Sequence, residues 1–216
     1  MLPFADNSDD TCPPDKISNC CMAQTTNVQP ILSVPTSNET IPRLRVVFDV
    51  ESVGVYGEAF AVGWVAIDQD GMEVESGIFC CPSNLAKGRD SDREWIEKHV
   101  VPTLPPTNCE SPFDVRCAFW ARLHSWRLQR AEFWADCGYP VEAKFLIDCV
   151  LDDQANRVWT APYPLNEIAS VLKLTGKDPL GTYPRLDREL PVHNPICDAR
   201  QSARLLHEST CNNNDR

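Results

Sequence analysis

The stretch that decides the fold is Leu44-Arg-Val-Val-Phe-Asp-Val-Glu51, a run dominated by β-branched and aromatic residues. Such a run predicts a strand that is buried on both faces of a sheet. Residues 58–67 form a second apolar run, and the turn sequence Asp68-Gln-Asp-Gly71 precedes a third run over residues 72–81. These three segments predict an antiparallel meander.

Strands alternating with helices follow this meander. Residues 131–136 read as a fourth strand. Helices are predicted to begin near Ser91 and to cover residues 113–130, 140–151, 164–176 and 195–210. Three antiparallel strands, then strands alternating with helices, predict a mixed α/β domain over residues 43–210.

The two ends of the chain differ from this domain. Residues 1–42 are rich in Pro, Ser, Thr and Asn, and their acidic residues are opposed by Lys16 alone. We expect a disordered acidic tail there, because too few apolar residues are present to offset the entropy of ordering. A short polar tail is expected over residues 211–216.

Composition limits the class of protein. The net charge of −11 argues against a protein that coats long nucleic acid, but it permits binding at an end or through bridging metal ions. Neither a membrane helix nor a signal peptide is expected from the sequence, so we expect a cytoplasmic protein. The 11 cysteines include no C-x-x-C pair and are expected to be reduced.

Two acidic side chains project together from the first strand. Asp49 and Glu51 are two residues apart, so a strand directs both to the same face. Two buried like charges are costly without a counter-ion, and a divalent metal ion, which prefers carboxylate oxygens, removes that cost. The alternative is a solvated strand end that binds nothing.

A histidine and an aspartate mark the start of the last helix. Asn-Pro-Ile-Cys separates His193 from Asp198, and the Asn-Pro pair is typical of an N-cap and a first helical turn. Asp198 falls on the side of the helix that is expected to be buried. An imidazole suits a general base near neutral pH, although an isolated loop histidine is also compatible with no role.

A further acidic position lies between these motifs. Asp136 ends the fourth strand, which is expected to pair beside the first. Glu142 falls in the first turn of the next helix, among the apolar positions of Val141, Phe145 and Leu146. A charge there favours a ligand role, and the alternative is an acid stabilised by the helix dipole.

Phe48-Asp-Val-Glu-Ser52, the mid-chain acid and His193-Asn-Pro-Ile-Cys-Asp198 together resemble the signature of the DEDDh 3′–5′ exonucleases. This family includes the proofreading exonuclease subunits of bacterial DNA polymerases and many stand-alone RNases. The resemblance covers about residues 44–206 and implies a ribonuclease H-like fold. It also implies hydrolysis at the 3′ end of single-stranded RNA or DNA, with release of nucleoside 5′-monophosphates.

The resemblance assigns roles residue by residue. Asp49 would bridge two divalent ions, Mg²⁺ or Mn²⁺, and Glu51 and Asp198 would bind the ion that holds the attacking water. His193 would take the proton of that water. Ser52 matches the position near which relatives bind the terminal 3′-hydroxyl.

The middle motif departs from the family pattern. Relatives often read Asn-x-x-x-Asp-x-x-Phe-Leu, whereas Glu142-Ala-Lys-Phe-Leu146 fills that frame here. We therefore expect Asp136 to be the fourth carboxylate, with Glu142 as the alternative. Tyr56 lies where relatives stack the terminal base, whereas the six tryptophans and Tyr163 are assigned to the core.

Three other functions remain open at this point. An endonuclease of the same fold would not need the loop histidine. A non-catalytic binding or scaffold protein on a decayed exonuclease fold would not bind metal through Asp49. A zinc-binding adaptor would use the cysteines. Homodimerisation is possible from the sequence, which does not distinguish RNA from DNA as substrate.

Overall fold

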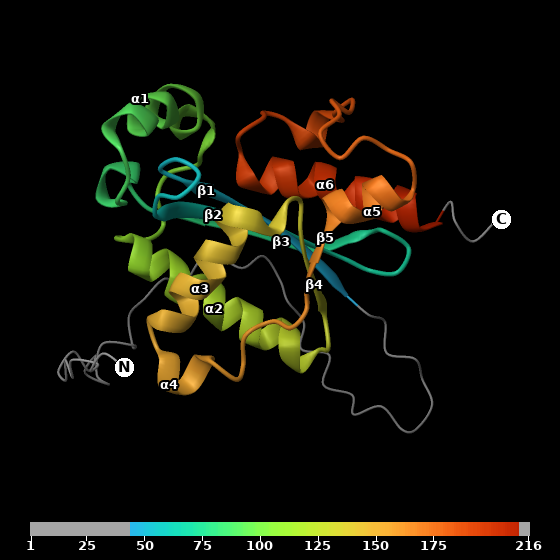
Figure 1. The fold of residues 1–216 in the computed structure, drawn as a ribbon, viewed down its shortest axis with the longest axis horizontal. Helices are drawn as coiled ribbons and strands as arrows, with labels where there is room; N and C mark the ends of the chain where they lie inside the picture. Colours follow the sequence, from blue (N-terminus) through green and yellow to red (C-terminus); the bar gives the residue numbers. More distant parts are fainter. Residues whose placement is uncertain (1–43, 212–216) are drawn as a thin grey trace, which may run out of the picture.

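A five-stranded sheet in the order β3-β2-β1-β4-β5 runs through the middle of the molecule (Figure 1). The structure, a computed structural model, describes residues 44–211. The tail predicted over residues 1–42 lies outside the described residues, as does the tail predicted over 211–216 apart from Cys211, which ends helix α6. The strands are Arg45–Ser52 (β1), Ala59–Ile67 (β2), Glu73–Cys80 (β3), Glu132–Ala135 (β4) and Leu165–Glu167 (β5).

The pairing of the strands confirms the mixed sheet that the sequence predicts. β2 pairs antiparallel with both β1 and β3, whereas β4 pairs parallel with both β1 and β5. The helix predicted over residues 164–176 is wrong at its start, because Leu165–Glu167 forms β5 and α5 covers only Ile168–Leu174. Three residues are too few to show a strand periodicity, so only pairing with β4 reveals this strand.

Helices cover both faces of the sheet (Figure 1). α2 (Pro112–Leu128) and α3 (Ala143–Leu151) pack against the face that carries Val46, Phe48 and Val50. α5 and α6 (Pro195–Cys211) pack against the opposite face, which carries Val47. The remaining helices are α1 (Asp90–His99) and the short α4 (Gln154–Arg157), and the latter was not predicted.

The alternation of β1 decides where its acidic residues point. Val47 faces α5 and α6, so Asp49 and Glu51, at two-residue intervals from it, lie on the same face. Asp49 is paired with Gly63 of β2. A Cβ atom at Gly63 would lie 2.3 Å from the backbone nitrogen of Ile196 in the first turn of α6, a distance that real Cβ atoms do not show. Gly63 thus allows the start of α6 to approach Asp49.

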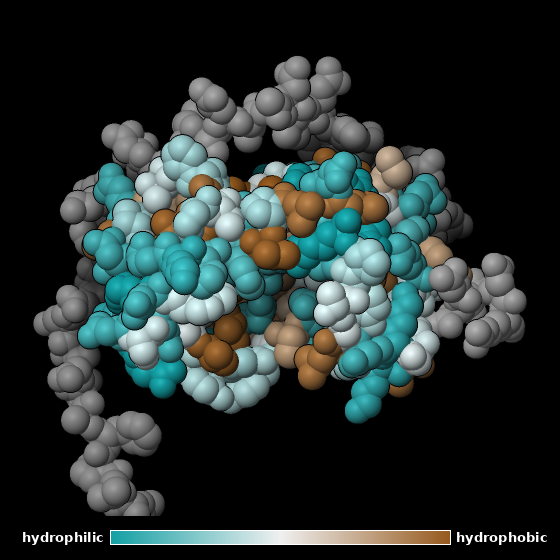
Figure 2. All heavy atoms as spheres, turned by 90° about the horizontal axis from the view of Figure 1, so that it is seen from above, coloured by the Kyte–Doolittle hydropathy of each residue, from teal (hydrophilic) through white to brown (hydrophobic). Residues whose placement is uncertain are grey.

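One face of the molecule carries hydrophobic side chains in small separate groups. Figure 2 shows several such patches on one face, divided by hydrophilic residues. Scattered exposed apolar side chains are ordinary on protein surfaces. Among the described helices, none has both the length and the apolar character needed to span a membrane.

Candidate active site

Three of the predicted site residues lie together at the end of β1 and the start of α6. One ligand atom each from Glu51, His193 and Asp198 lies within 4.8 Å of the others. Among the described residues this is the group of acidic, histidine and cysteine side chains close enough to hold a metal ion. No cysteine belongs to it, which gives no support to the zinc adaptor.

Asp49 is at the centre of a larger group of acids. Burial raises the pKa of its carboxyl well above the ordinary value, and the charges of four neighbouring acids raise it further. In decreasing order of effect, these neighbours are Glu51, Glu142, Asp198 and Asp136. Among the described residues, Asp49 has no ion pair with a basic side chain. The chain therefore gathers five acids around a site that lacks a matching number of cations.

The pKa values of Glu51 and Glu142 are also raised. Burial, with the charges of Asp198 and Glu142, raises the pKa of Glu51 to about 8. Burial also raises the pKa of Glu142 to about 7, although backbone N–H groups, including that of Val50, oppose the shift. Carboxyl groups with raised pKa values that share a cleft are typical of functional sites.

The structure places the two candidates for the fourth carboxylate differently. Glu142 is buried at the end of a π-helical turn (η4, Gly138–Glu142) that leads into α3, and its charge affects both Asp49 and Glu51. Asp136 is exposed, and its effect on Asp49 is the smallest of the four neighbouring acids. Although the residue as a whole is exposed, its carboxyl has lost enough solvation to raise the pKa of Asp136. The hydroxyl of Ser202 and the charge of Arg185 oppose this rise, and the charge of Asp198 adds to it.

His193 is held by its backbone. Its N–H donates a hydrogen bond of 3.0 Å to Oδ2 of Asp198, and its carbonyl accepts one of 2.7 Å from Oγ1 of Thr103. Its φ angle is 62°, in the left-handed region that histidine enters more readily than most residues. Asn194 donates to the carbonyl of Thr103 at 2.6 Å and accepts from the N–H of Ile196 at 3.2 Å. The predicted cap at Asn194 is confirmed, and these hydrogen bonds hold the backbone of His193 at the start of α6.

Ser52 follows Glu51 but turns to the opposite face. It is buried, and its hydroxyl donates a hydrogen bond of 2.8 Å to the carbonyl of Gly54. The hydroxyl therefore stabilises the turn after β1. A role of Ser52 in substrate binding stays a prediction.

Two residues beside the site carry no signal in the sequence. Trp95 of α1 is 47% exposed, and its ring meets that of His193 edge-on, with ring centres 5.1 Å apart. The second is Arg185, whose Nη1 lies 2.5 Å from Oδ1 of Asp198. The assignment of all six tryptophans and Tyr163 to the core is wrong for Trp95, Trp159 and Tyr163, because all three are exposed.

Tyr56 also stands at the edge of this region. It is 71% exposed, and its hydroxyl interacts with that of the equally exposed Tyr139, which follows β4. Tyr56 lies in the loop after β1, which ends at Ser52, and Tyr139 lies within η4, which ends at Glu142. The segments that carry these two exposed rings therefore adjoin Glu51 and Glu142 in the sequence.

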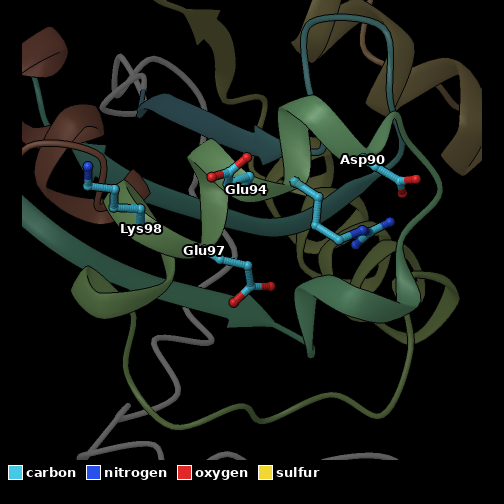
Figure 3. A pocket seen from close by; sticks show the side chains of 5 residues that line it. Asp90, Glu94, Glu97 and Lys98 are labelled. Carbon is cyan, nitrogen blue, oxygen red and sulfur yellow. The ribbon is translucent and has the colours of Figure 1, made fainter.

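One surface hollow is not lined by any of the predicted site residues. That hollow, about 580 Å³, is lined by side chains of α1 alone (Figure 3). The lining residues are Asp90, Arg93, Glu94, Glu97 and Lys98. Because one helix forms it and none of the predicted site residues reaches it, we assign it no function.

The donor set at the acidic group fits hard divalent cations. Carboxylate oxygens from β1, α6 and the start of α3 are the ligands that Mg²⁺ and Mn²⁺ prefer. Desolvated acids with raised pKa values, such as Asp49, are stabilised as anions when such a cation binds. The arrangement is therefore compatible with the binding of divalent metal ions.

Comparison with known proteins identifies the fold. A product-bound structure of exonuclease I, solved at 1.5 Å, matches with a TM-score of 0.53 and 12% sequence identity. The match covers 79% of this chain and 45% of that chain. The chain therefore spans slightly less than half the length of the protein that it matches. No model of a protein family and no curated protein matches the sequence. The chain therefore has the ribonuclease H-like α/β fold found in exonucleases, as expected from its sequence.

Proposed function

We propose that this protein is a metal-dependent 3′–5′ exonuclease of the DEDDh type. The observation that carries the proposal is the convergence of four acids with His193 at one point of an exonuclease-like fold. Asp49 and Glu51 come from β1, Glu142 from η4, Asp198 from α6 and His193 from the loop before it. A structural framework has no need of five acids, Asp136 included, around one point, because four of them raise the pKa of the buried Asp49 and this costs stability.

The proposal gives each residue a task. Two divalent ions would be held by Asp49, Glu51, Asp198 and Glu142. We choose Glu142 over Asp136 as the fourth ligand because Glu142 is buried and its charge raises the pKa of Asp49 more than that of Asp136 does. Bound ions would supply charge stabilisation for the attacking and leaving oxygens of a phosphodiester. His193, fixed at its backbone, would accept the proton of the attacking water.

The substrate class follows from charge and from the exposed aromatic rings. A chain with a net charge of −11 is poorly suited to neutralise many phosphates at once, so we propose that only the terminal nucleotides are held. The exposed ring of Trp95, in contact with His193, and that of Tyr56, in the loop after β1, suit stacking on unpaired bases of any sequence. Single-stranded RNA or DNA with a free 3′ end is the proposed partner, and nucleoside 5′-monophosphates are the proposed products.

The direct test is digestion of single strands labelled at either end. Purified full-length protein is incubated with 5′-labelled and 3′-labelled RNA and DNA in Mg²⁺, in Mn²⁺ and in excess chelator. We expect a ladder shortened from the 3′ end, with free 5′-monophosphates, only when metal is present. The Asp49→Asn variant is the matched control and should be inactive. Hydrolysis in excess chelator, or internal cuts only, would contradict the proposal; binding of RNA or DNA without hydrolysis would favour a scaffold.

A further inference from the structure

Arg185 makes direct contact with the acidic group from the long segment between α5 and α6. Its Nη1 donates to Oδ1 of Asp198 at 2.5 Å and to the carbonyl of Glu189 at 2.8 Å. Its charge opposes the rise in pKa of both Asp198 and Asp136. The guanidinium group therefore acts as a counter-ion that contacts Asp198 and also affects Asp136.

The segment around Arg185 is built to hold it there. Glu189 is fully buried, and its carboxylate accepts hydrogen bonds of 2.7 and 2.9 Å from Nε and Nη2 of Arg204 in α6. The same carboxylate accepts from the N–H of Leu186 at 3.0 Å, and Arg204 donates to the carbonyl of Pro184 at 2.8 Å. Both chain neighbours of Arg185 are thus fixed through one buried ion pair, so its position is not that of a free surface side chain.

Asp198 already has a donor on each oxygen. Oδ1 accepts from Arg185, and Oδ2 accepts from the backbone N–H of His193. On Arg185, by contrast, Nε and Nη2 have no hydrogen-bond partner among the described residues, and the side chain is 21% exposed. A guanidinium group can donate two parallel hydrogen bonds to a phosphate. Among the described residues, Nη1 of Arg185 thus donates to Asp198, whereas Nε and Nη2 remain able to donate to another group.

We propose that Arg185 couples phosphate binding to metal binding, by neutralising Asp198 until a substrate phosphate attracts its free N–H groups. This inference rests on the proposed function, since it assumes that Asp198 is a metal ligand. A positive charge beside Asp198 repels a divalent cation, so Arg185 weakens metal binding in the absence of substrate. A phosphate that engages Arg185 reduces this repulsion, and by reciprocity bound metal strengthens phosphate binding.

The test is calorimetric titration of Mn²⁺ into the full-length protein, with and without adenosine 5′-monophosphate as the phosphate probe. Arg185→Gln removes the charge, and Arg188→Gln, which removes the same charge from an exposed position in the same segment, is the matched control. We expect the Mn²⁺ Kd of Arg185→Gln to be about tenfold lower than that of the wild type, within the usual range of coupling between sites. Arg188→Gln should bind Mn²⁺ like the wild type.

The nucleotide gives the second readout. The nucleotide should lower the Mn²⁺ Kd of the wild type several-fold. This decrease should be roughly as large as the decrease in Mn²⁺ Kd that Arg185→Gln causes in the absence of nucleotide. The nucleotide should change the Kd of Arg185→Gln little. If Arg185→Gln proves unstable, Arg185→Lys keeps the charge and loses the planar fork, so it should bind Mn²⁺ like the wild type but respond less to the nucleotide.

Two failures are distinguishable. If wild-type protein binds Mn²⁺ no better than Asp49→Asn, the metal centre itself, and with it the proposed function, is wrong. If wild-type protein binds Mn²⁺ through Asp49 but Arg185→Gln binds it equally or more weakly, Arg185 is not a competing counter-ion, and only this inference is overturned.

Discussion

The carboxylate of Asp198 reaches back past the start of α6 and accepts a 3.0 Å hydrogen bond from the backbone N–H of His193. Asp198 lies one turn inside the helix, and its own N–H donates to the carbonyl of Asn194 at 2.9 Å. A helix N-terminus leaves N–H groups without partners, so an acid at this spacing satisfies one of them just before the cap. The spacing of the motif is thus a local requirement that fixes the histidine beside its aspartate.

Replacement of His193 should separate chemistry from metal binding. His193→Ala should lower kcat by roughly 10²–10⁴-fold, the usual contribution of a positioned acid–base group, with little change in the Mn²⁺ Kd. The φ angle at this position is 62°, and asparagine tolerates the left-handed region better than alanine does. His193→Asn should therefore give the same loss of kcat as His193→Ala, with a smaller fall in melting temperature. His124→Ala, at an exposed position in α2, is the control. Unchanged turnover in both His193 variants would exclude this residue as the base.

Asp49 should matter for metal binding and oppose stability. Asp49→Asn should lose Mn²⁺ affinity and activity. In metal-free buffer, however, it should melt at the same temperature as the wild type or at a higher one. The reason is that it removes a negative charge, which burial and four neighbouring acids disfavour. Asp70→Asn, at an exposed turn, should change neither property. A clear loss of metal-free stability in Asp49→Asn would show that the acid has a structural partner.

The fourth carboxylate can be identified by paired substitutions. Glu142→Gln should lower kcat by at least about 100-fold, since it removes a ligand, whereas Asp136→Asn at its exposed position should cost less than about tenfold. Single-turnover rates at saturating Mn²⁺ measure the difference. The reverse order would restore Asp136 as the ligand, as the sequence first suggests.

The stability of the metal-free protein should fall as pH rises. Glu51 and Glu142 keep their protons to about pH 8 and 7 in the folded state, whereas an ordinary glutamate loses its proton near 4.5. The folded state therefore binds more protons than the unfolded state between these values, so the free energy of unfolding decreases across that window. Urea denaturation at pH 5 and pH 8 measures it, and Glu51→Gln should reduce the slope. Saturating Mg²⁺ should largely remove the loss at pH 8, because it binds the deprotonated acids.

Trp95 should contribute to substrate binding. In the inactive Asp49→Asn background, Trp95→Ala should raise the Kd for a short single strand roughly tenfold, and Trp95→Phe should restore part of the affinity, because stacking needs an aromatic face. Trp159→Ala, which removes an 87% exposed indole not in contact with His193, is the control. Fluorescence anisotropy with a labelled strand measures both, and equal affinities of Trp95→Ala and wild type would remove this residue from the substrate site.

The local pattern alone determined β1, the meander and the common face of Asp49 and Glu51. Each depends on contiguous residues, since β-branched runs favour strands and two-residue spacing fixes which face a side chain takes. The cap at Asn194 was equally readable, because capping needs only neighbours in the chain. Short-range rules of this kind were therefore enough to pick out the Asp49–Glu51 pair and the start of the last helix as candidate site motifs.

Tertiary structure decided what sequence spacing could not. The ranking of Glu142 above Asp136 depends on burial against β1, and β5 exists only because β4 offers it a partner. Arg185 sits in a segment without helical or strand periodicity, and the buried pair of Glu189 with Arg204 brings it to Asp198. Such contacts join residues through space, and an arginine in an irregular segment has the same sequence pattern whether it faces solvent or a cluster of acids.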